Sequence, residues 1–122
     1  MQMPALLSLA ASAAGHAAAR QAVTARNVVN ADTPGFRPSD LTPFAPERGG
    51  FEARATRVGH MAGADARPWR AVAEKGPLDP NGNGVDLETE ILRGVDAQRA
   101  HDRALTVYRS ALDLMRTSLG RR

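Results

Sequence analysis

The sequence predicts a mainly α-helical protein with a long helix at each end and an irregular middle segment. Small and apolar residues recur at helical spacing near both ends. Seven of the eight prolines lie between residues 34 and 80. Aromatic residues make up only 4% of the chain, and much of its 43% hydrophobic content is alanine. Because so few large side chains are available for a core, the two helices should pair with each other as a coiled-coil-like hairpin, or with other chains.

These observations divide the chain into three parts. Residues 1–35 form an N-terminal helix that ends in a turn. Residues 36–84 form an irregular middle, rich in proline and glycine, for which we expect loops, a small β-hairpin and partial disorder. Residues 85–122 form a second helix with a repeating apolar stripe.

The N-terminal helix is predicted from about Ala5 to Asn30, with a seam made mostly of small residues. It should stop there because Pro34 disfavours helical geometry at Thr33. Pro34 and Gly35 fit the two central positions of a type II turn, in which glycine accepts a positive φ. Asn30 and Asn27 are then positioned to bond carbonyls at the helix end or on a neighbouring backbone.

The C-terminal helix has a clear start. A turn sequence, Asn81-Gly82-Asn83-Gly84, precedes it. Asp86 is expected to cap the helix by accepting backbone N–H bonds. Glu88 and Glu90 follow in the first turns, where the helix dipole favours negative charge.

From this start, apolar and other seam residues recur in alternating steps of four and three, which is a heptad stripe. A helix of about 33 residues would be roughly 50 Å long. A small chain with little else to pack needs a partner for such a helix, so the stripe is predicted to be an assembly seam. Its residues are Leu87, Ile91, Gly94, Gln98, His101, Leu105, Tyr108, Leu112, Met115 and Leu119.

The residue types argue against an enzyme, a metal site or a bound cofactor. The chain has no cysteine. His16, His60 and His101 lie in three different segments, without the short spacing of metal ligands. No complete phosphate-binding loop or catalytic constellation is visible.

The net charge of +3 and the pI near 10.5 leave one alternative, a small basic helical protein that binds nucleic acid. The arginines of the second helix are spread around it and interleaved with acidic residues, however, and no nucleic-acid-binding module is visible. The N-terminus lacks the basic segment of a secretory signal, and its apolar stretch is too short to span a membrane.

Two motifs resemble those of flagellar axial proteins, the family of rod, hook and hook-associated proteins. The first resembles the N-x-x-N-x-x-T-P-G-aromatic signature of the family through Asn27, Asn30, Thr33, Pro34, Gly35 and Phe36. The second, from Asn83 to Glu90, resembles a segment of the proximal rod member through residues that include Asp86 and Leu87. Together the motifs and adjoining helices cover about half of the chain.

The resemblance implies a structural subunit of the flagellar basal-body rod that is needed for motility. Such subunits are exported from the cytoplasm by the flagellar type III apparatus, and their terminal helices are largely disordered until they assemble in the periplasm-spanning rod. The implied partners are other copies of the chain, neighbouring rod subunits, the basal-body adaptor protein and the export gate. No nucleic acid, membrane span or cofactor is implied.

Overall fold

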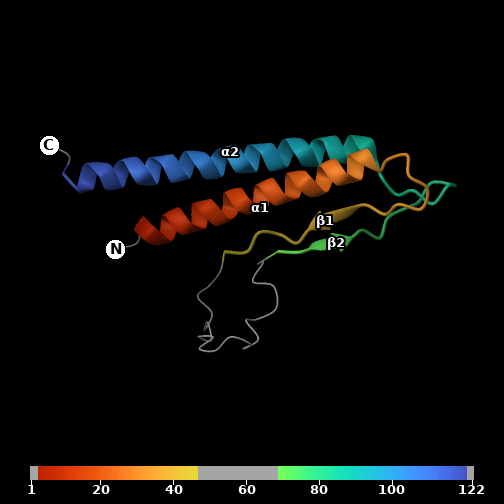
Figure 1. Ribbon diagram of the computed structural model, residues 1–122, viewed down its shortest axis with the longest axis horizontal. Helices are drawn as coiled ribbons and strands as arrows, with labels where there is room; N and C mark the ends of the chain where they lie inside the picture. The colour runs from red at the N-terminus through yellow and green to blue at the C-terminus, as the bar shows by residue number, and fades with distance from the viewer. Residues whose placement is uncertain (1–2, 47–68, 121–122) are drawn as a thin grey trace, which may run out of the picture.

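The structure, a computed structural model, describes residues 3–46 and 69–120. It contains α1 (Met3–Val29), β1 (Ser39–Leu41), β2 (Ala71–Ala73) and α2 (Leu87–Ser118). The two helices lie side by side and run in opposite directions, with both chain ends at one end of the pair (Figure 1). The predicted mainly helical fold is therefore confirmed. The part of the predicted irregular middle from 47 to 68, which includes His60, lies outside the described residues.

The two helices pack through small residues that recur every seven positions. The buried hydrophobic residues on the described part of the chain are all alanines, and all five of them follow this repeat together with Thr24 and Glu90. Because alanine has a short side chain, the helix backbones can approach closely. The repeat consists of Ala10, Ala17 and Thr24 on α1 and of Glu90, Ala97, Ala104 and Ala111 on α2.

One hydrogen bond and one close approach of the helices define the register of the pair. The side-chain amide of Gln21 donates to Gln98. A Cβ on Gly94 would lie 3.6 Å from the Thr24 methyl group. This register sets Ala17 opposite the interval between Ala97 and Ala104, so the small residues of the two helices alternate along the seam.

The buried line on α2 does not coincide with the predicted stripe; it runs beside it. Leu105, Tyr108, Leu112 and Met115 are half-buried at its edge, and Gly94 and His101 are also half-buried. Leu87, Ile91, Gln98 and Leu119 are exposed. Large apolar residues therefore flank the contact between the helices, and alanines form its centre.

The middle segment returns along α1 as a short two-stranded ladder. β1 pairs with β2 in antiparallel register, with Ser39 opposite Ala73 and Leu41 opposite Ala71. Beyond the ladder, His16 on α1 lies between the rings of Phe44 and Trp69, with centroid distances of 5.6 Å and 5.4 Å. His16 therefore helps to hold the middle segment against α1.

Candidate assembly site at the closed end of the helix pair

The closed end of the pair is the end where α1 stops and α2 starts. We call the segments that meet there, residues 30–38 and 77–86, the junction. Its first segment turns at Pro34 and Gly35: the Phe36 N–H donates to the Thr33 carbonyl at 3.2 Å, and Gly35 has a φ of 72°. These values agree with the type II turn that the sequence predicts, because its third residue needs a positive φ.

Asn83 is the centre of the junction and is only 1% exposed. Its Nδ2 donates to the Asn30 carbonyl at 2.9 Å and to the Thr33 carbonyl at 2.7 Å. Its Oδ1 accepts from the Val85 N–H at 2.7 Å. A single buried amide thus joins the chain leaving α1 to the chain entering α2, and its hydrogen-bonding groups are satisfied.

Glycines allow the two segments of the junction to approach closely. Gly82 has a φ of 82°, and a Cβ there would lie 3.3 Å from the Gly35 Cα. A Cβ on Gly84 would lie 2.9 Å from a Leu78 methyl group. Main-chain bonds complete the contact, since the Gly35 N–H donates to the Asn81 carbonyl at 3.1 Å and the Gly84 N–H to the Phe36 carbonyl at 3.0 Å.

The two asparagines of the first motif have different partners. Asn30 Nδ2 donates to the Arg26 carbonyl at 2.8 Å, which satisfies a carbonyl at the end of α1. Asn27 is fully buried, and its amide exchanges two bonds with the backbone of Ser39: Nδ2 donates to the carbonyl at 2.8 Å, and Oδ1 accepts from the N–H at 3.2 Å. Asn27 therefore fixes the start of β1 on α1.

Asp86 is the N-cap of α2. Its carboxylate accepts from the Glu88 N–H at 3.1 Å and from the Thr89 hydroxyl at 2.5 Å. The Thr89 hydrogen bond is the largest contribution to a lowered pKa of Asp86, and backbone bonds act in the same direction. Asp86 therefore keeps its charge at the positive end of the helix dipole.

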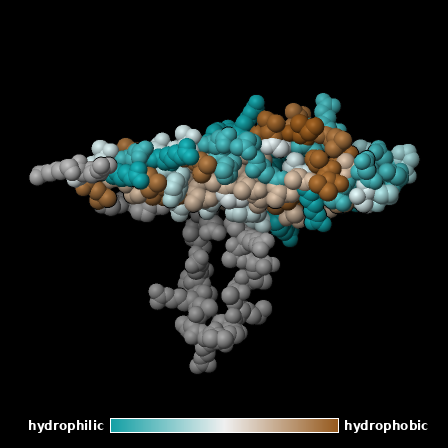
Figure 2. All heavy atoms as spheres, turned by 45° about the horizontal axis from the view of Figure 1, so that its top comes forward, coloured by the Kyte–Doolittle hydropathy of each residue, from teal (hydrophilic) through white to brown (hydrophobic). Residues whose placement is uncertain are grey.

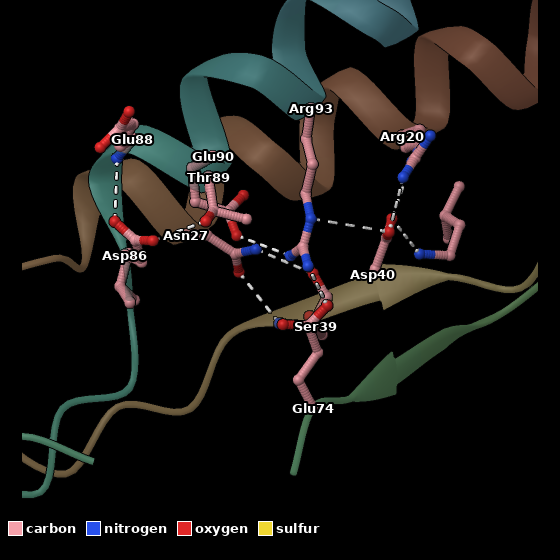
Figure 3. A network of polar contacts seen from close by, with 12 residues as sticks. Arg20, Asn27, Ser39, Asp40, Glu74, Asp86, Glu88, Thr89, Glu90 and Arg93 are labelled. Atoms are coloured by element: carbon pink, nitrogen blue, oxygen red, sulfur yellow. Dashed lines mark hydrogen bonds and ion pairs between the residues drawn. The ribbon is translucent and has the colours of Figure 1, made fainter. Parts of the chain in front are cut away.

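Next to the junction, an ion-pair cluster joins both helices to β1 and to Glu74, directly after β2 (Figure 3). Arg20 binds Asp40 through two hydrogen bonds of 2.9 Å and 2.7 Å. The guanidinium nitrogens of Arg93 lie 2.7 Å from a carboxylate oxygen of Glu74, 2.9 Å from one of Glu90 and 4.0 Å from one of Asp40. Glu90 is only 1% exposed, and its Oε2 has no hydrogen-bond partner among the described residues.

Three groups of the cluster, Arg20, Asp40 and Arg93, have pKa values shifted in the direction that favours their charged forms. Burial opposes ionisation of Asp40, but the hydrogen bond from Arg20, the Leu41 N–H and the charges of Arg20 and Arg93 together lower the pKa of its carboxyl group. Burial likewise opposes the charge of Arg93, whereas its bond to Glu74 and the surrounding carboxylates raise its pKa. The bond to Asp40 raises the pKa of Arg20.

The structure brings the residues of the two sequence motifs together at the closed end, although residues 37–82 separate the motifs in the chain. The residues of the predicted assembly seam do not lie at the closed end, apart from those at the start of α2. Sequence reasoning missed the ion-pair cluster: Arg20, Asp40, Glu74 and Arg93 were not singled out. For Arg20 and Arg93, the signal would have been a charged residue at helical spacing on a seam-facing side, which also occurs on ordinary solvated helices.

The geometry at the junction is suited to holding chain segments in place. Among the residues that the structure describes, no group of three or more His, Cys, Asp or Glu side chains could hold a metal ion. Neither described helix is long and apolar enough to cross a membrane.

The N-terminal part of the chain matches a known family. Residues 7–37, from α1 through the turn, match the family model described as flagella basal body rod protein. No curated protein matches the chain. The matched segment contains the complete first motif, whereas the second motif, from Asn83 to Glu90, lies outside it.

Proposed function

Since residues 7–37 identify this chain with the flagella basal body rod proteins, we propose that it is the proximal rod subunit, of the FlgB type, and that it assembles through its terminal helices. A structural role in the flagellar basal body follows from the family match. The observation that supports the finer assignment is the junction. There Asn83 of the second motif bonds to the first motif, and Asp86 of the second motif caps the start of α2.

The packing of the pair supports assembly with other chains. Buried hydrophobic residues on the described segments are all alanines, whereas leucines and valines remain exposed on both helices. Burying alanine contributes little free energy compared with burying leucine. We infer that neighbouring subunits cover the larger side chains and that the predicted seam lies in such contacts.

The proposed partners are further copies of the chain, neighbouring rod subunits, the adaptor protein beneath the rod and the export gate. The proposed route is export from the cytoplasm through the type III apparatus, followed by folding in the periplasm-spanning rod. Motility would then depend on the chain.

Binding to nucleic acid gains no support from the charges. Arg20 and Arg93 pair with carboxylates in the cluster, and Arg116 lies 3.3 Å from Asp113 on α2. Such pairing leaves these guanidinium groups less available to phosphates.

Deletion of the chain in its source cell tests the proposal. Electron microscopy of the remaining basal bodies should show the membrane ring without rod and hook, and cells should regain motility when the wild-type chain is restored. Complete rods in the deletion strain would contradict the proposal. As a second arm, Leu105→Asp should prevent assembly, whereas Thr106→Asp at the next, exposed position should not.

A further inference from the structure

The outer face of α2, which points away from α1, changes character along the helix. Four exposed apolar side chains cover its first turns: Leu87 at 48%, Ile91 at 62%, Leu92 at 61% and Val95 at 43%. At 100° per residue they lie within an arc of about 140°, which begins beside the alanine seam at Leu87 and reaches the side opposite the seam at Leu92. We call these four residues the outer apolar face. Figure 2 shows a large group of brown apolar atoms toward the closed end of the pair, with smaller brown groups elsewhere.

Beyond Val95, the same side of α2 is polar. Asp102, Thr106, Arg109 and Asp113 take the corresponding positions, and all are exposed. An ordinary solvated helix would be polar along its entire outer side. The apolar stretch is therefore local, and it is the part of α2 that needs a partner outside the helix pair.

An apolar groove lies toward the opposite, open end of the molecule, between α1, α2 and the segment after β1. Its volume is about 470 Å³. We call it the open-end groove, and the apolar residues that matter here are Leu6, Leu9, Ala13, Phe44, Ala104 and Val107. Arg103 is the charged residue in its lining.

We propose that the outer apolar face of one copy of this chain docks into the open-end groove of the next copy. The proposal rests on the proposed rod function and specifies which surfaces meet. Charge complementarity supports a second copy as the occupant: Glu88 lies on the same side of α2 as the outer apolar face, and Arg103 lines the groove. Docking would bring these opposite charges to one contact.

The two surfaces also agree in length. Residues 87–95 span about 12 Å along a helix, and the groove follows α2 from residue 100 to 107, which is about 10 Å. Because the surfaces lie toward opposite ends of one chain, each docked copy leaves a free groove at one end and a free apolar face at the other. Such a heterologous contact continues as an open row and does not close into a dimer.

Cysteine cross-linking in isolated basal bodies tests this contact. The chain has no cysteine of its own, so introduced pairs give no background. The test variant combines Leu92→Cys on the outer apolar face with Ala13→Cys in the groove. The control combines Leu92→Cys with Arg109→Cys, on the polar stretch of the same side of α2.

With a short thiol-reactive cross-linker, we expect a ladder of dimers and higher multimers for the 92/13 pair and mostly monomer for the 92/109 pair. A 92/13 sample that yields no more multimers than the control would overturn the proposal. If that happens while the chain is present in the basal bodies, the rod function stands and only this contact is wrong. If the chain is absent from basal bodies, both proposals fall.

A charge exchange adds a readout that misfolding alone would not produce. In the 92/13 background, Glu88→Arg or Arg103→Glu alone should remove most of the ladder, and the two together should restore it. A general weakening of α2 by either substitution would not be repaired by the other. Failure of the double exchange to recover multimers would count against the pairing of these two residues.

Discussion

Asn83 and Asn30 lie 53 positions apart in the chain, yet the side-chain amide of Asn83 donates to the main-chain carbonyl of Asn30 at 2.9 Å. The same amide donates to Thr33 at 2.7 Å. One buried side chain therefore determines how the two long helices are connected, because it joins the segment that leaves α1 to the segment that enters α2.

Replacing Asn83 should destabilise the helix pair. Asn83→Ala removes both donors and leaves the carbonyls of Asn30 and Thr33 without these partners, which should lower the free energy of unfolding by about 1–3 kcal/mol. Urea denaturation followed by circular dichroism measures this change. Asn30→Ala is the matched control, since its amide makes an exposed bond to Arg26 and its loss should cost less. Equal effects of the two substitutions would contradict the central position of Asn83.

Replacing Gly35, in the turn after α1, should destabilise the folded chain because of the backbone conformation at this position. Gly35 has a φ of 72° and no atom within 4 Å of an added Cβ, so Gly35→Ala introduces backbone strain without a clash. We expect a loss of about 1–2 kcal/mol in unfolding free energy. Gly76→Ala, where a Cβ also meets nothing within 4 Å, should be nearly neutral in the same denaturation experiment. A tolerated Gly35→Ala would show that the turn does not need a left-handed residue.

The alanine seam predicts opposite effects at two neighbouring positions. Ala97 is 1% exposed, so Ala97→Leu should force the helices apart and cost about 1–3 kcal/mol. Gly94→Ala adds a methyl group at an ordinary 3.6 Å contact with Thr24 and should stabilise α2 by up to about 1 kcal/mol. Thermal melts of both variants measure the effects. A stabilising Ala97→Leu would mean that the seam is loosely packed.

Asp40 should give stability that depends on pH. Because its pKa is lower in the folded chain than in the unfolded chain, its contribution is present above the unfolded value, near 4, and is lost as pH falls through the folded value. Asp40→Asn should therefore be less stable than the wild type at pH 6, and the difference should shrink progressively below about pH 4. Denaturation midpoints of both proteins from pH 2 to pH 7 measure this difference. A difference that stays constant down to pH 2 would exclude the ion pair with Arg20 as its cause.

Local signals in the sequence predicted much of the fold. Pro34 and Gly35 indicated the end of α1, and Asp86 indicated the start of α2, because turns and caps depend on a few adjacent residues. The long-range contacts were harder to predict. Asn83 was identified as part of a helix start, but its bonds to Asn30 and Thr33 depend on how the distant segments return to each other.

The helix seam shows the same difference between local and long-range information. The stripe on α2 was predicted from large apolar residues such as Leu105 and Leu112. The contact between the two helices is instead centred on Ala97, Ala104 and Ala111. Alanine is common on every side of a helix, so its seven-residue repeat becomes meaningful only when the partner helix has a matching one. Glu90 was placed at the helix start because of its charge, although the structure buries it beside Arg93.

If this chain is a structural component of the flagellar basal-body rod, it must be present in basal bodies purified from the source cell. Mass spectrometry of such basal bodies should detect peptides of this chain. We expect these peptides to remain after salt washing, which removes loosely bound proteins. Basal bodies that contain complete rods but no peptide of this chain would contradict this role.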